Sequence, residues 1–194
     1  MVRRGRLRPE ERQTAAEDAQ GPRARLAGQG TLGRQGLTAV RIRRARPGDA
    51  PVIARLANAL NRHEHLPQRF TPAVVRRDAL GRRPRFRVLI AEIDGHIVGY
   101  TSIIDGYNTD IAAPELFMLD LFVVARWRSR GVGRALVSAV AREAVRRRLH
   151  CLEWGVRGNN TRAKRFYRRL GATIGNARVA ALTGRALTAL ADAR

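Results

Sequence analysis

The sequence predicts an α/β fold, a mixed and mostly antiparallel sheet of six or seven strands with one parallel βαβ crossover and flanking helices. Two observations predict this class. Residues 116–170 alternate between strand and helix patterns, and such alternation requires a parallel crossover. Residues 85–104 form two apolar strand patterns joined by Asp94 and Gly95, a dipeptide that favours a tight hairpin turn. An antiparallel meander therefore precedes the crossover.

The first 38 residues are rich in Arg, Glu, Gln, Gly and Ala and carry hardly any large apolar side chain. Such a segment buries too little surface to offset the entropy lost on ordering, so we expect residues 1–38 to be a disordered tail. A single domain is expected over residues 39–194. Its first strand begins where Val40 and Ile42 alternate with arginines.

Two helices are expected between the first strand and the hairpin. Asp49 is suited to cap a helix that Pro51 opens, because a side-chain oxygen there can accept a free backbone N–H. A second, short helix is expected from Thr71 to Leu80 and ends at Gly81.

The second half of the chain follows a regular order. Residues 115–124 form a nearly continuous apolar run, which suits a strand in the middle of a sheet. A helix is expected over residues 131–150, a strand over 151–156 and another helix over 161–170. Residues 172–184 are expected to add one or two last strands.

The formal net charge of +22 attracts polyanions. The positive charge is nonetheless scattered along the chain, with Lys164 as the only lysine, so we do not expect nucleic-acid binding to be the primary function. No run approaches the roughly 20 apolar residues that cross a membrane, and no membrane partner is expected. The single cysteine, Cys151, and the absence of a signal-peptide pattern agree with a cytoplasmic protein.

A basic turn with two glycines, RWRSRGVGRAL, lies between the central strand and the helix that follows it. Free backbone N–H groups and the positive end of the helix dipole converge there, which favours an anion. Gly131 and Gly133 let a ligand approach the main chain, and Arg128 and Arg130 add positive charge. The alternative is a tight turn with solvated arginines. The run matches neither a Walker loop nor a G-x-G-x-x-G fingerprint.

The run Arg128–Gly133, R-x-x-G-x-G, and the strand LDLFV before it resemble the acetyl-CoA motif of the GNAT acetyltransferase family. A second segment matches that family's N-x-x-A-x-x-F-Y-x-x-L-G pattern. Its matching residues are Asn160, Ala163, Phe166, Tyr167, Leu170 and Gly171. The resemblance covers about residues 39–190. The hairpin, the loop before the central strand and the phrase LDLFV look most similar to the diamine N-acetyltransferase-like branch.

The resemblance implies acetyl-CoA as the acetyl donor. Its pyrophosphate would lie on the turn amides, and its pantetheine arm would lie beside the end of the central strand. A main-chain N–H of Phe122 or Val123 would polarise the thioester carbonyl. The residues expected to hold acetyl-CoA are Leu121, Phe122, Val123, Arg128, Ser129, Arg130, Gly131, Val132, Gly133, Arg134, Asn160, Ala163 and Phe166. Asn160 can also cap its helix, and Phe166 can belong to the apolar face of that helix.

Tyr167 matches the general acid of the family, which protonates the departing thiolate of CoA. The alternative is a tyrosine that only packs on the apolar face of its helix. The acceptor amine must lose a proton before it attacks, so a carboxylate or a water chain should help. Three carboxylates lie on or near the expected strands of the cleft: Asp120, Glu115 and Glu153. Of these, Asp120 is the expected catalytic carboxylate.

Glu64 matches an acidic residue that binds amines in the diamine branch, and it is a candidate substrate contact; otherwise it is a solvated charge. Leu119 stands where those relatives have a glutamate, which places polyamine specificity in doubt. His63 and His65 have no third ligand nearby in the sequence, so no metal site is expected.

We therefore expect an enzyme, an N-acetyltransferase that moves the acetyl group of acetyl-CoA to a primary amine of a small molecule. The amine would attack directly within a ternary complex. A protein lysine or N-terminus as the acceptor remains an alternative, as does a non-catalytic acetyl-CoA- or nucleic-acid-binding module. Pairing through an edge strand is common among similar proteins, so a homodimer also stays open.

Overall fold

The computed structural model describes residues 39–176 and 180–192. The described residues 39–170 belong to one compact unit, which holds the sheet and the helices next to it. The expected tail, residues 1–38, lies outside the described residues, and its disorder stays a prediction. None of the described helices combines the length and the apolar character that a membrane span needs.

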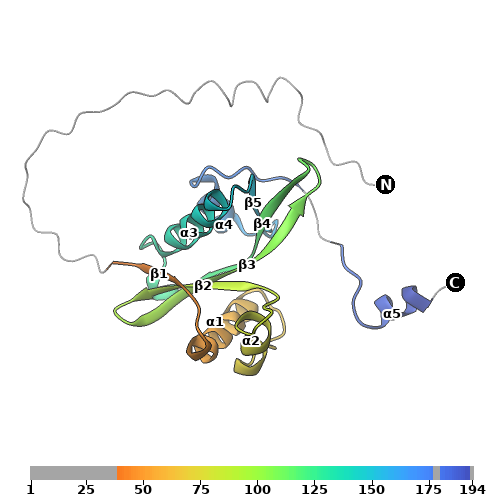
Figure 1. The fold of residues 1–194 in the computed structure, drawn as a ribbon, viewed down its shortest axis with the longest axis horizontal. Helices are drawn as coiled ribbons and strands as arrows, with labels where there is room; N and C mark the ends of the chain where they lie inside the picture. The colour runs from red at the N-terminus through yellow and green to blue at the C-terminus, as the bar shows by residue number, and fades with distance from the viewer. Residues whose placement is uncertain (1–38, 177–179, 193–194) are drawn as a thin grey trace, which may run out of the picture. The chain divides into compact units, whose positions relative to one another are not determined.

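Five strands form one sheet in their order along the chain (Figure 1). They are β1 (Arg41–Arg44), β2 (Arg87–Ile93), β3 (His96–Asn108), β4 (Ala113–Val123) and β5 (Cys151–Trp154). Neighbouring strands are antiparallel except for β4 and β5, which are parallel and joined by the crossover helix. The expected α/β class is confirmed, with five strands among the described residues instead of six or seven.

The missing strands were expected in residues 172–184. Residues 172–176 and 180–183 form no strand, and residues 177–179 lie outside the described part of the chain. More than half of this segment is Ala, Gly and Asn, which bury little apolar area and are depleted in strands. The second unit of the chain, which includes residues 171–194, contains the short helix α5 (Arg185–Asp192).

Helices lie on both faces of the sheet (Figure 1). On one face lie α1 (Ala50–His63) and α2 (Pro72–Ala79), and on the other lies α3 (Val132–Arg146); α4 (Thr161–Arg168) follows β5. Two short 3-10 helices, η2 (Pro47–Asp49) and η3 (Ala125–Trp127), precede α1 and α3. The core under α1 and α2 is apolar and includes Ile53, Leu56, Val75, Ile90 and Tyr100, each at most 5% exposed.

The local signals for the hairpin and for α2 are confirmed. Asp94 and Gly95 have φ angles of 49° and 74°, as a tight turn between β2 and β3 requires. Thr71 caps α2 by accepting the N–H of Val74 at 3.1 Å. Asp49 was expected to cap α1, and this detail was wrong. Its carboxylate accepts two hydrogen bonds from Arg43 instead, because a bidentate guanidinium is the stronger partner.

The pairing between β3 and β4 is irregular near the end of β4. Ser102 of β3 pairs with Asp120 and Ile103 pairs with Met118, so Leu119 is an extra residue that makes a β-bulge. Strand β5 pairs only with residues 115–118 of β4. The last five residues of β4 therefore have no neighbour from β5, and the sheet opens along that edge.

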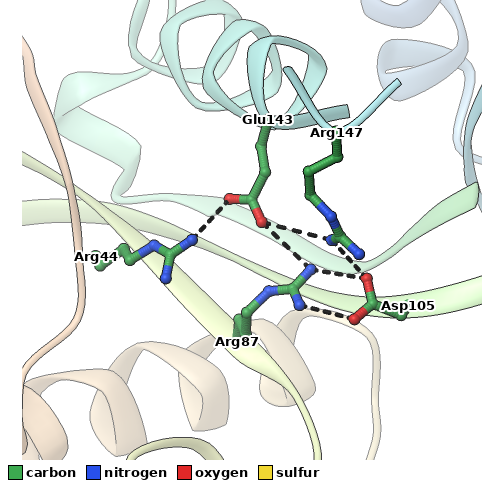
Figure 2. Close-up of polar contacts among 5 residues, drawn as sticks. All are labelled: Arg44, Arg87, Asp105, Glu143 and Arg147. Carbon is green, nitrogen blue, oxygen red and sulfur yellow. Dashed lines mark hydrogen bonds and ion pairs between the residues drawn. The ribbon is translucent and has the colours of Figure 1, made fainter. Parts of the chain in front are cut away.

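An ion-pair network ties α3 to three strands. Figure 2 shows the carboxylate of Glu143, on α3, between Arg44 of β1, Arg87 of β2 and Arg147, the residue that directly follows α3. The nitrogen-to-oxygen distances from Glu143 to these arginines are 3.6, 3.3 and 3.7 Å. Arg87 and Arg147 also bind Asp105 of β3, and the hydrogen bonds from Arg87 above all lower the pKa of Asp105 to about 2. The network thus fixes the crossover helix on its face of the sheet.

Gly99 lets β3 approach β4 beside the opening of the sheet. A Cβ atom at position 99 would lie 2.8 Å from the carbonyl oxygen of Phe122, a backbone atom that has little freedom to move. We expect Gly99→Ala to destabilise the protein by about 1 to 3 kcal/mol, the usual effect of overpacking. Urea unfolding measures this loss, with Gly48→Ala as the control, since nothing lies within 4 Å of a Cβ there. Equal stability of the two variants would contradict the expected clash.

Candidate active site

A cavity of about 590 Å³ opens where β4 and β5 separate. The end of β4, the glycine turn, α4 with the loop before it, and the end of α1 supply its walls. Most of the residues singled out in the sequence line it: Glu64, Asp120, Leu121, Phe122, Val123, Arg128, Ser129, Gly131, Gly133, Arg134, Asn160, Ala163, Phe166 and Tyr167. The fold therefore brings both sequence motifs to one place.

Two of the expected cofactor-binding residues have side chains that do not line the cavity. Val132 is only 1% exposed and belongs to the core, because it is the first residue of α3 and faces the sheet. The guanidinium of Arg130 lies over the ring of Trp127, 5.2 Å from its centre, instead of along the cavity wall. The backbone of the turn remains a cofactor contact in our proposal, but these two side chains do not.

The backbone of β4 presents alternate residues to the cavity. The carbonyl of Phe122 faces β3, since it lies close to the position of a Cβ at Gly99. The carbonyl of Val123 points the other way and accepts a hydrogen bond from the Nε of Arg128 at 2.9 Å. Because strand backbone groups alternate in direction, the N–H groups of Leu121 and Val123 face the opening, whereas that of Phe122 faces β3.

The turn before α3 is strongly curved. Ser129 and Gly131 have φ angles of 62° and 80°, and Gly131 is the residue that precedes the helix. The first N–H of α3 with a helical acceptor is that of Ala135, which donates to the carbonyl of Gly131. The preceding N–H groups at the helix start are therefore free for an anion. A Cβ at Gly133 would lie 3.3 Å from the ring of Phe166, so glycine keeps this approach open.

Asn160 caps α4, which confirms one of the two roles expected for it. Its Oδ1 accepts the N–H of Ala163 at 3.0 Å, and the residue also lines the cavity. The cap orients the helix that carries Phe166 and Tyr167, whose rings lie 5.2 Å apart. A role of Asn160 in contacting the cofactor stays a proposal.

Tyr167 is 8% exposed and packs against Trp154 of β5, with ring centres 4.9 Å apart. Burial raises the pKa of its phenol to about 12. The hydroxyl has no hydrogen-bond partner among the described residues. A phenol that is protonated at neutral pH, lines a cavity and has no competing partner can donate its proton to a ligand there.

Asp120 is the carboxylate that the fold places at the cavity. Its Oδ2 accepts hydrogen bonds from Ser102 at 2.8 Å and Tyr100 at 3.2 Å. Burial, and next the charge of Asp120, raise the pKa of Tyr100, so this phenol stays a donor. The second carboxylate oxygen, Oδ1, makes no hydrogen bond within the described part of the chain, which leaves it free for a ligand.

The other two candidate carboxylates lie away from the cavity. Glu115 and Glu153 lie beside Cys151 at the start of β4 and β5, with the potential ligand atoms of the three side chains within 4.8 Å of one another. Asn108 donates to Glu153 at 2.9 Å. Burial above all raises the pKa of the Cys151 thiol, which disfavours the thiolate that a nucleophilic cysteine needs.

Glu64 was expected to be either a substrate contact or a solvated charge, and the structure adds a partner that the sequence did not indicate. Its carboxylate forms an ion pair with Arg157, from the loop between β5 and α4, and both residues line the cavity. Glu64 follows the last turn of α1, where its N–H donates to the carbonyl of Leu60. Residues so far apart in the chain leave no local pattern that could have identified the pair.

The sequence is similar to those of known proteins. The model of the Acetyltransferase (GNAT) family matches residues 53–172. Thialysine N-epsilon-acetyltransferase from Bos taurus is 30% identical over 148 residues, which cover 69% of this chain and 84% of that protein. L-ornithine N5-acetyltransferase from Arabidopsis thaliana is 32% identical over 95 residues, 48% of this chain and 42% of the relative.

The fold has solved counterparts as well. The structure of an aminoglycoside N-acetyltransferase in complex with CoA matches with a TM-score of 0.64 and 21% identity, over 79% of this chain and 99% of that one. At this identity the likeness concerns the fold alone.

Proposed function

This chain belongs to the GNAT acetyltransferase family and is an N-acetyltransferase, and we propose that it transfers the acetyl group of acetyl-CoA to a primary amine of a small molecule. The observation that carries the proposal is the cavity between β4 and α4, which joins free strand amides, a turn with free N–H groups and a buried phenol. The curated relatives that act on thialysine and ornithine, both small amines, support the acceptor class.

Three parts of the chain would hold the donor. The free N–H groups at the start of α3 bind the pyrophosphate, because a helix N-terminus favours an anion. The pantetheine arm lies along the open edge of β4, where Leu121 and Val123 offer N–H groups that no strand uses. One of these two amides polarises the thioester carbonyl, and the amide of Phe122 does not, since it faces β3.

The reaction then needs two proton transfers. The amine nitrogen attacks the thioester carbon, and its proton passes to Asp120, directly or through water, at the free oxygen Oδ1. The carbon–sulfur bond breaks, and Tyr167 donates its phenolic proton to the departing thiolate. Both residues line the cavity, Asp120 from β4 and Tyr167 from α4.

Calorimetric titration of the full chain with acetyl-CoA tests the cofactor site. We expect saturable one-to-one binding that is much tighter than binding of ADP or inorganic pyrophosphate and that resists moderate salt. These controls are needed because a protein with a net charge of +22 binds phosphates loosely at low salt. Weak binding that is shared by all three ligands and is abolished by salt would contradict the site.

The pH dependence of the rate tests the proposed acid. A phenol can donate only while protonated, so activity is lost as the pH rises through its pKa. Because burial raises the pKa of Tyr167 to about 12, kcat/KM should rise as the amine deprotonates and show no decline up to about pH 10.5, although an exposed tyrosine titrates near 10. A decline centred between about pH 9 and 10 would contradict this role.

A further inference from the structure

We infer that the ion pair between Glu64 and Arg157 is a binding site for the head group of an amino acid, so that the preferred acceptor is a diamino acid with a free α-carboxylate and α-ammonium group. The inference rests on the proposed function and specifies its substrate. Arg157 would bind the carboxylate and Glu64 the ammonium group. The side-chain amine of the same molecule would then reach Asp120 and be acetylated.

The position of the pair supports this assignment. The pair joins two of the segments that line the cavity, the end of α1 and the loop before α4. The side chain of Arg157 is 54% exposed and that of Glu64 is 19% exposed, so solvent and ligands can reach both charges. A ligand that enters between these segments can exchange places with the internal partner of each residue, because an exposed ion pair contributes little by itself.

The helix ends next to the ion pair favour the same two charged groups of the ligand, the ammonium group and the carboxylate. Glu64 follows the C-terminal turn of α1, where the negative end of the helix dipole favours a cation. Arg157 lies just before α4, whose positive end favours a carboxylate. The carbonyl of Arg157 accepts the N–H of Asn160 at 3.0 Å, which holds this loop against the start of α4.

The charge of the whole cavity favours an acceptor that carries a carboxylate. Its walls hold five arginines and two acidic residues: Arg128, Arg134, Arg157, Arg162 and Arg169, with Glu64 and Asp120. A simple diamine adds two positive charges and, by taking Glu64, leaves Arg157 unpaired beside a cation. A zwitterionic head group leaves neither residue unpaired. Leu119, at the bulge of β4, offers an apolar contact for the methylene chain between the two ends of the substrate.

The test compares acceptors that differ only in the carboxylate: L-ornithine against putrescine, and L-lysine against cadaverine. With the native chain, we expect kcat/KM to be about 10-fold or more higher for the amino acid of each pair, since a hydrogen bond to a charged group is worth roughly this factor. In Arg157→Gln the preference should fall by about 10-fold, through a higher KM for the amino acids with little change in kcat or in the values for the diamines.

Arg162→Gln is the matched control, because Arg162 also lines the cavity but has no ion pair with a described residue. It should change the values for the amino acid and the diamine by the same factor. An equal loss on both substrates in Arg157→Gln would assign Arg157 a purely structural role and overturn the inference. So would a native enzyme that acetylates diamines as well as amino acids, although the proposed function would then stand. No acetylation of any small amine would overturn both.

Discussion

Tyr167→Phe should lower kcat by about 100-fold or more, the usual effect of losing a positioned proton donor. The substitution removes only the hydroxyl, and that hydroxyl makes no hydrogen bond with a described residue. The ring contacts with Trp154 and Phe166 are those of a phenyl group and are retained. We therefore expect the thermal midpoint and the affinity for acetyl-CoA to stay nearly unchanged, while turnover is lost.

This combination separates a catalytic role from a packing role. If Tyr167 only filled the apolar face of α4, the phenylalanine variant would turn over within a few-fold of the native rate. Tyr107→Phe is the control, because Tyr107 is 60% exposed and lies outside the cavity wall. Turnover and acetyl-CoA titration of the two variants, measured side by side, decide between the roles. A native rate in Tyr167→Phe would remove this residue from the mechanism.

Glu143→Gln should destabilise the fold by about 2 kcal/mol, more than an ordinary surface substitution. The carboxylate is buried, with the side chain 8% exposed, and it pairs with three arginines, which come from β1, from β2 and from the position directly after α3 (Figure 2). Without it, Asp105 is the one acidic partner that the described residues leave to Arg87 and Arg147, and Arg87 already has a buried Nε without a hydrogen-bond partner among them. The effect stays below that of a fully buried pair because Arg44 remains 67% exposed.

Thermal unfolding measures this loss, and a decrease of the Tm by about 4 to 8 °C is expected for a chain of this size. Asp78→Asn is the matched control. Asp78 also pairs with two arginines, Arg77 and Arg85, but these are 73% and 82% exposed. Its removal should change the Tm far less than Glu143→Gln does, because ion pairs with exposed arginines contribute little. Equal effects of the two variants would mean that the network around Glu143 contributes no more than surface charges do.

The sequence predicted those parts of the fold whose signal is local. The apolar run before the glycine turn predicted β4, and the helical pattern after the turn predicted α3. Asp94 and Gly95 predicted the hairpin turn. Each pattern determines the geometry of its own segment. Residues 172–184 carry no comparable pattern, and the strands expected there are not found in their described residues. Asp49 shows a different limit, since a distant arginine competed successfully for its carboxylate.

The candidate site follows the same division. The two motifs brought Tyr167, Asn160 and the glycine turn to one cavity, because a crossover connects the strands and helices that carry them. The bulge at Leu119 could not be predicted from the sequence, since it depends on the register between β3 and β4. The pairing of Glu64 with Arg157 was also beyond it, because it depends on how α1 and the loop before α4 pack on the sheet.

The measurement that tests the central claim most directly is the release of CoA thiol when the full chain is mixed with acetyl-CoA and a small primary amine such as L-ornithine. We predict a release that requires both the protein and the amine, saturates with each substrate, and yields an amine that carries one added acetyl group. Binding of acetyl-CoA without amine-dependent release, across ornithine, lysine and their decarboxylated diamines, would contradict the account. The chain would then have kept the donor site without transferring the acetyl group to small amines.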